Sequence, residues 1–143
     1  MEKISILMVK EHERINDMLD DFQREVDIGL HDAGFLFNKF KWNLEKHFFV
    51  EEKAIYTIYE SLMGEQISDI FHLMQEHGEV MEMVKAIEEK LRNGLKPEVF
   101  KLKEILIKHR KFEDDFFYPK LDEALDDVHR QEVIEKVKEV IRG

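Results

Sequence analysis

The chain has 143 residues, of which 38% are charged and 43% hydrophobic, with a formal net charge of −10 and no cysteine. This length and composition predict one soluble globular domain over residues 1–143. The acidic balance disfavours sequence-independent nucleic-acid binding and docking on anionic membranes, and the lack of cysteine excludes disulfides, thiolate zinc sites and cysteine nucleophiles.

The first residues, MEKISILMVKEHERIND, contain only a short apolar stretch before charges begin. This pattern is not typical of a signal peptide. No apolar run approaches the roughly 18 residues that a membrane span needs. We therefore expect a cytoplasmic protein that contacts no membrane.

Apolar residues recur with helical spacing from the start of the chain. The first predicted helix carries a stripe at alternating intervals of four and three residues: Met8, His12, Ile15, Leu19, Phe22 and Val26. The sequence GLHDAG at 29–34 supplies helix breakers and predicts a turn. The second predicted helix carries a similar stripe: Phe37, Phe40, Leu44, His47, Glu51, Ile55, Ile58 and Leu62. Gly64 is its predicted stop.

Three further helices are predicted in the second half of the chain. The stripe of the third is Ile70, Met74, His77, Met81 or Val80, Val84, Ile87 and Leu91, and Asn93 and Gly94 should end it. The stripe of the fourth is Val99, Leu102, Leu106, His109, Glu113 and Phe116. Pro97 suits its first turn, and Pro119 should stop or kink it. A shorter amphipathic helix follows over about residues 130–142.

Four long helices joined by short links predict an all-α, up-down-up-down four-helix bundle over about residues 3–118, with an extra C-terminal helix. No sustained alternation with a period of two predicts a strand. An internal repeat is also evident. EHERINDML from residue 11 matches EHGEVMEMV from residue 76, and KHFFVEEKAIYTIYE from residue 46 matches KHRKFEDDFFYPKLD from residue 108. We therefore expect an approximate two-fold axis that relates the first helix pair to the second.

Six ionisable residues occupy positions within the apolar stripes: His12, His47, Glu51, His77, His109 and Glu113. Each lies roughly 9 to 16 residues from the predicted start of its helix, and neighbouring helices run in opposite directions. At a rise of about 1.5 Å per residue, all six can therefore share one layer at mid-bundle. The spacing His-x3-Glu, which occurs twice, places each histidine and its glutamate on one helix face.

Such a layer is costly unless its charges are compensated. Two divalent cations bring four positive charges, of which the two glutamates and a bridging hydroxide would cancel three. Symmetry predicts the ligands as His12 and His47 for one ion, His77 and His109 for the other, and Glu51 and Glu113 as bridges. These ligands suit non-haem iron, and zinc or manganese also fits. A hydrogen-bonded His–Glu network without metal is the alternative.

This pattern resembles the hemerythrin-like family, the HHE cation-binding domains. The residues that carry the resemblance are Glu11-His12, His47-x3-Glu51-Glu52, Glu76-His77, His109-x3-Glu113-Asp114 and FFYP at 116–119. The resemblance spans about residues 5–120 and leaves out the last helix. It implies a bundle around an oxo- or hydroxo-bridged pair of iron ions that binds O2 or a related small molecule. Oxygen carriage, sensing of oxygen or iron, and peroxide or nitric oxide chemistry are the roles it suggests.

The chain departs from the oxygen-carrying members of that family in two helices. Carriers have His-x3-His in the third helix, whereas Leu73 and Met81 stand four residues before and after His77. His72 lies about 140° round the helix from His77 and is expected to point elsewhere. In the fourth helix the carriers place aspartate one residue later, where Asp114 stands here, but the repeat favours Glu113 as the ligand.

With four histidines, both ions would keep open positions, which suit bridging ligands and redox turnover better than reversible oxygen carriage. We therefore expect a sensor or a small redox protein, and leave a peroxidase-type enzymatic activity open. The alternatives are an iron-sensing or metal-binding regulatory module, and a structural di-zinc bundle without redox chemistry. The last helix is predicted either to cap the bundle or to pair with a second copy or a partner protein.

A few polar residues near the predicted layer have weaker claims. Asn16, one turn after His12, is either a hydrogen-bond partner of the site or an ordinary helix residue. Glu52 and Asp114 either face outward or accept hydrogen bonds from the histidines. Tyr56 and Tyr118 lie nine residues after a histidine, about 180° round an α-helix, and are expected to pack between helices rather than contact metal.

Overall fold

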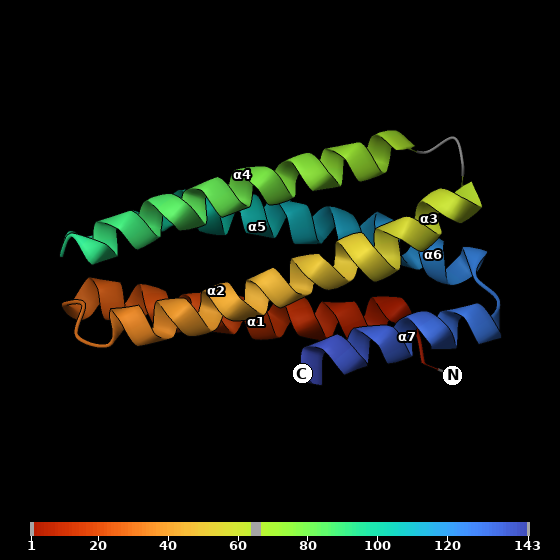
Figure 1. Cartoon of the computed structure of the whole chain (residues 1–143), viewed down its shortest axis with the longest axis horizontal. Helices are drawn as coiled ribbons and strands as arrows, with labels where there is room; N and C mark the ends of the chain where they lie inside the picture. Colours follow the sequence, from red (N-terminus) through yellow and green to blue (C-terminus); the bar gives the residue numbers. More distant parts are fainter. Residues whose placement is uncertain (1, 64–66, 143) are drawn as a thin grey trace.

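The computed structural model describes residues 2–63 and 67–142, and within these ranges every regular element is helical (Figure 1). The first four elements form two antiparallel rods: α1 (Ile4–Ile28), then α2 (Ala33–Val50) with η1 (Glu51–Ile55) and α3 (Tyr56–Met63). The next rods are α4 (Ile67–Arg92) and α5 (Phe100–Phe112) with η2 (Glu113–Phe117) and α6 (Tyr118–Ala124). The last helix is α7 (Asp127–Arg142). The predicted all-α, up-down-up-down bundle is confirmed.

Two apolar clusters fill the bundle, one on each side of a polar layer. One cluster joins Ile4 and Met8 of α1 to residues of α3, α6 and α7. The other cluster lies toward the opposite end of the bundle. It joins the α1 residues from Ile15 to Val26 to residues of α2, α4 and α5. His12 lies between the two clusters, because it is the one polar residue in the apolar stripe of α1 from Met8 to Ile15. The other three rods are interrupted at the same level, so the amphipathic pattern of each helix places its polar residues in a common layer.

The turns differ from the prediction in three details. Gly29 has a positive φ of 133° and ends α1, but Gly34 lies inside α2 because that helix already begins at Ala33. Pro97 lies before α5 rather than in its first turn, since α5 begins at Phe100. Of the two alternatives for Pro119, a stop is contradicted, because the fourth rod continues to Ala124. Gly64, the predicted stop of the second helix, lies outside the described residues.

Two π-helical turns interrupt the second and fourth rods at equivalent places. In η1 the amide of Tyr56 donates to the carbonyl of Glu51, and in η2 the amide of Tyr118 donates to the carbonyl of Glu113. Each bond spans five residues instead of the four of an α-helix. The extra residue rotates everything that follows it, so Tyr56 and Tyr118 lie on the same face as the glutamates that precede them.

The last helix folds back along the bundle (Figure 1) and buries its apolar stripe, Val133, Ile134 and Val137, in the first apolar cluster. It begins at Asp127, earlier than predicted. Just before it, the carboxylate of Asp122 accepts hydrogen bonds from the amides of Ile4 (2.8 Å) and Ser5 (3.0 Å). This contact supplies the cap that the start of α1 lacks locally.

Across the described ranges, we find no helix with the length and apolarity needed to cross a membrane.

Candidate metal centre

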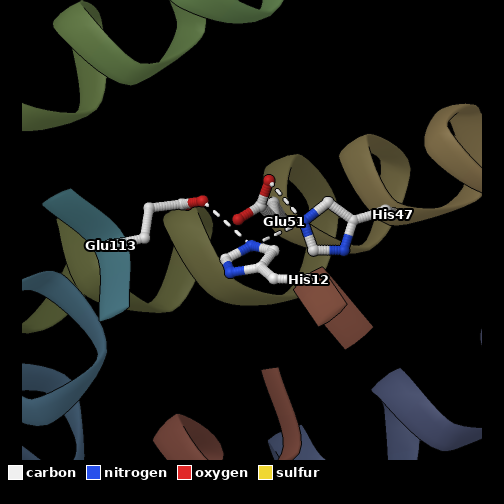
Figure 2. A group of neighbouring side chains, drawn as sticks. All are labelled: His12, His47, Glu51 and Glu113. Atoms are coloured by element: carbon white, nitrogen blue, oxygen red, sulfur yellow. Dashed lines mark hydrogen bonds and ion pairs between the residues drawn. The ribbon is translucent and has the colours of Figure 1, made fainter. Parts of the chain in front are cut away.

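The six predicted site residues come together in the polar layer. Glu51 and Glu113 are fully buried at 0% exposure, and none of the four histidines exceeds 6%. Figure 2 shows four of them, His12 from α1, His47 from α2, and the two glutamates from the π turns, with their polar ends directed at one another. His77 from α4 and His109 from α5 complete the set, so each of the four rods contributes at least one side chain to the buried cluster.

The histidines form two pairs, as the repeat predicts. His12 Nε2 lies 3.1 Å from His47 Nε2, and His77 Nε2 lies 3.1 Å from His109 Nε2. The glutamates lie between the pairs.

Glu51 Oε1 lies 3.1 Å from His77 Nε2 and 3.3 Å from His47 Nε2. Glu113 Oε1 lies 3.1 Å from His109 Nε2 and 3.4 Å from His12 Nε2. One oxygen of each carboxylate thus faces one histidine of each pair, which is the placement that a bridging ligand needs.

This donor set fits divalent cations. Within each histidine pair two Nε2 atoms face each other, and at most one proton can satisfy such a contact. Glu113 Oε1 is buried and finds no hydrogen-bond partner among the described residues. Two subsets have ligand atoms that all lie within 4.8 Å of one another: His12, His47, Glu51 and Glu113, and Glu51, His77 and His109. A cation would satisfy both the facing nitrogens and the orphaned oxygen.

Charge and burial act against each other in this cluster. Burial by itself would lower the pKa of His12, but the hydrogen bond to Asp114 and the nearby glutamates outweigh it and raise the pKa to about 9. Burial would likewise lower the pKa of His109, but the nearby carboxylates, Glu113 above all, outweigh it and raise the pKa well above its usual value. Burial would raise the pKa of Glu51, yet the histidines, His47 above all, lower it well below its usual value. Cations entering the site must therefore displace protons from histidine.

A second ring of carboxylates contacts the outer nitrogens of the histidines. His12 Nδ1 lies 2.8 Å from Asp114, so of the two alternatives for Asp114 the structure supports the hydrogen bond. His109 Nδ1 lies 2.9 Å from Glu76. Glu52 is 3.7 Å from His77 Nδ1, beyond hydrogen-bond distance. Such partners orient a metal-binding imidazole and raise its basicity.

Both tyrosines are buried between helices, but the expectation that they lie about 180° from the histidines is wrong. Tyr56 donates a 2.8 Å hydrogen bond to Glu113 Oε2, and Tyr118 donates one to Glu51 Oε2. The prediction assumed uninterrupted α-helix, and the π turns remove the assumed half-turn offset. The signal was present in the sequence, because each tyrosine follows its glutamate by five residues, the length of one π turn. Burial and the neighbouring carboxylates raise the pKa of both hydroxyls well above the usual value.

Other residues near the layer are also placed by the structure. His72 has an exposed side chain and is 3.6 Å from Glu76, so it lies outside the cluster, as expected. Phe48, which the sequence did not single out, stacks on His77 with ring centroids 3.8 Å apart and planes inclined by 13°. Asn16 lines a small cavity beside the cluster.

That cavity has a volume of about 30 Å³, and three of the four histidines border it. The remaining lining is mostly apolar: Ile15, Leu44, Phe48 and Leu106, with Asn16 and Arg110 as polar residues. A volume of this size holds one or two molecules as small as water. A separate open groove of about 400 Å³ reaches His77 from the surface between α2 and α4, with Met81 in its lining.

Comparison with known families identifies the chain. The hemerythrin HHE cation-binding domain matches residues 4–121, which include nearly all of the four rods and exclude α7. Comparisons with curated proteins and with solved structures gave no match. The chain is a metal-binding protein that belongs to the hemerythrin HHE cation-binding domain family.

Proposed function

We propose that this protein binds two iron ions, one held by His12 and His47 and the other by His77 and His109. Glu51 and Glu113 would bridge them. The observation that carries the proposal is the set of six buried side chains whose ligand atoms converge in two overlapping groups. Manganese or zinc would find the same donors, and the choice of iron rests on the family and on the mixed imidazole and carboxylate set.

The small ligand would be O2, peroxide or nitric oxide. Bound iron would supply one-electron chemistry and open coordination positions for such a molecule. The chain supplies a cavity of about 30 Å³ bordered by three of the candidate histidine ligands. Its walls are mostly apolar, so they would admit a small molecule and exclude larger polar ones.

We infer a sensor or small redox protein rather than a dedicated carrier. No histidine stands one turn before or after His77: Leu73 is buried in the apolar core, and Met81 lines the open groove. Neither side chain offers a nitrogen or oxygen ligand, so each ion would have two histidines and shared carboxylates. Two incompletely coordinated ions suit bridging ligands and turnover.

The test is an absorption spectrum of iron-loaded, chemically reduced protein, recorded before and after admitting O2. We expect near-ultraviolet and visible charge-transfer bands typical of a bridged ferric pair, at two iron ions per chain. Bands that vanish when O2 is removed would indicate reversible binding and overturn the redox assignment. No bands at two bound metals per chain would indicate a structural site.

A regulatory role for metal loading is the second candidate, favoured by one contact of α7. Lys46, which precedes His47, donates a 3.2 Å hydrogen bond to the carbonyl of Ile141 in α7. Metal that orders His47 would also order this contact. Hydrogen exchange that slows in α7 on metal addition, without any reaction with O2, would favour the regulatory role.

A further inference from the structure

The small cavity beside the histidines has one side that is less buried than the rest. Most of its lining is buried, including the three histidines. The half-buried lining residues are Asn16 of α1 and Leu106 and Arg110 of α5. Because solvent reaches these three side chains most easily, a small molecule would enter the cavity between α1 and α5, past Arg110.

The internal repeat shows that Arg110 is a substitution for an aromatic residue. Its repeat equivalent in α2 is Phe48. Phe48 stacks on His77 with ring centroids 3.8 Å apart and so covers one face of that histidine. Arg110 instead forms an ion pair with Asp114, with Nε 3.7 Å from Oδ2. A cation therefore borders the cavity at a position where the other helix pair has a packed aromatic ring.

The guanidinium of Arg110 has donors to offer to an incoming molecule. Among the described residues that line the cavity, Arg110 alone carries a permanent charge. Its ion pair with Asp114 is longer than a hydrogen bond, and its side chain is 28% exposed. A guanidinium carries several N–H donors in a fixed planar arrangement. A small acceptor in the cavity would therefore find both a charge and free N–H groups.

We propose that Arg110 is a specificity-determining residue that makes the cavity prefer small monoanions, such as hydroperoxide or nitrite, over neutral molecules of similar size. The chain as a whole has a net charge of −10 and repels anions, so a local cation is needed to attract them. The cavity volume of about 30 Å³ limits the ligand to a few non-hydrogen atoms. The inference rests on the proposed two-ion site, to which the anion would bind.

A purely structural role for Arg110 makes a different prediction. Asp114 accepts a 2.8 Å contact from His12 Nδ1, so Arg110 could act only by holding Asp114 in place. Loss of such support would disturb the metal ligand His12 and weaken every small ligand alike. Loss of an attracting charge would weaken anions and leave neutral ligands unaffected. Comparing an anion with a neutral ligand therefore separates the two roles.

The experiment titrates azide into the full-length protein with two ferric ions per chain, followed by the charge-transfer absorption of the complex. Nitric oxide binding to the reduced protein is the neutral comparison. We expect Arg110→Gln to weaken azide binding about tenfold and to leave nitric oxide binding unchanged. Arg110→Lys keeps the charge and should keep most of the azide affinity. Lys111→Gln is the matched control, because Lys111 is the next residue, is exposed and lies outside the cavity lining.

Three outcomes would overturn the inference: unchanged azide affinity in Arg110→Gln, an equal loss for azide and nitric oxide, or an equal loss of azide affinity in Lys111→Gln. If Arg110→Gln does not retain two iron ions, the wild-type protein decides. Its azide association rate should fall as salt rises from about 0.1 to 0.5 M, because salt screens an attracting charge. A constant or rising rate would overturn the inference. A wild-type protein that binds fewer than two iron ions per chain would instead refute the proposed function.

Discussion

Tyr118 donates a hydrogen bond to Glu51, although 67 residues separate them and they come from different rods of the bundle. Tyr56 makes the reciprocal contact with Glu113. Because both acceptors are fully buried carboxylates, each hydroxyl stabilises a charge that has no access to water. The two tyrosines thus fix the outer oxygens of the glutamates and leave the inner oxygens facing the histidines.

Replacing the Tyr118 hydroxyl should destabilise the metal-free protein. We expect Tyr118→Phe to lower its free energy of unfolding by about 2 kcal/mol, because a buried carboxylate loses a charge-assisted hydrogen bond. Tyr59→Phe is the matched control, since Tyr59 donates a longer bond of 3.3 Å to the partly buried Asp69 and should cost less. Urea unfolding of both variants measures the difference. Equal decreases in the free energy of unfolding would show that the hydrogen bond to Glu51 stabilises the protein no more than the bond to Asp69.

The stability of the metal-free protein should fall as pH rises from neutral to alkaline. The pKa of His12 is about 9 in the folded chain, above its ordinary value of 6.5. Stability from its protonation is fully present below pH 6.5 and is lost as pH rises through 9. A shift of this size corresponds to about 3 kcal/mol. Urea unfolding in chelator across pH 6 to 9.5 measures the loss, and His12→Gln should flatten the profile.

Metal binding should strengthen over the same pH range. The raised pKa values of His12 and His109 mean that protons compete with the cation below pH 9. Titration calorimetry in two buffers of different ionisation enthalpy should detect protons released on binding at pH 7. The same number of protons bound before and after metal addition would contradict these pKa shifts.

Removing a candidate ligand should sharply lower metal content, whereas removing a nearby histidine outside the cluster should not. We expect His12→Ala and Glu51→Ala each to lower the bound metal from two ions per chain to one or fewer. His72→Ala should retain the full amount, because its side chain is exposed and its only ion pair within the described residues is with Glu76. Elemental analysis of the purified proteins gives the ratio. Loss of metal in His72→Ala alone would contradict the assignment of ligands.

The link between the end of the bundle and the start of α1 should contribute to stability. Asp122→Ala removes the acceptor for the amides of Ile4 and Ser5 and leaves Arg130 without one of its carboxylates. A lost helix cap typically costs about 1 to 2 kcal/mol. Glu123→Ala is the control, since Glu123 is the next residue and is exposed. Thermal unfolding compares the two variants, and equal melting temperatures would argue against the cap.

The periodicity of single helices was enough to predict the bundle and the six side chains that face its centre. Hydrophobic spacing depends only on residues within one helix, and His12, His47, His77 and His109 interrupt that spacing at matching heights. The internal repeat also predicted the pairing of the histidines that the distances show.

Tertiary structure decided what lies around these six residues. The π turns after His47 and His109 rotate Tyr56 and Tyr118 into the site. A prediction that assumes 3.6 residues per turn throughout does not include that rotation. Which carboxylate each histidine contacts was also beyond the sequence, because Glu76 and Asp114 reach their partners across helix interfaces. Periodicity determines the face on which a side chain lies, whereas its partner depends on how two helices pack together.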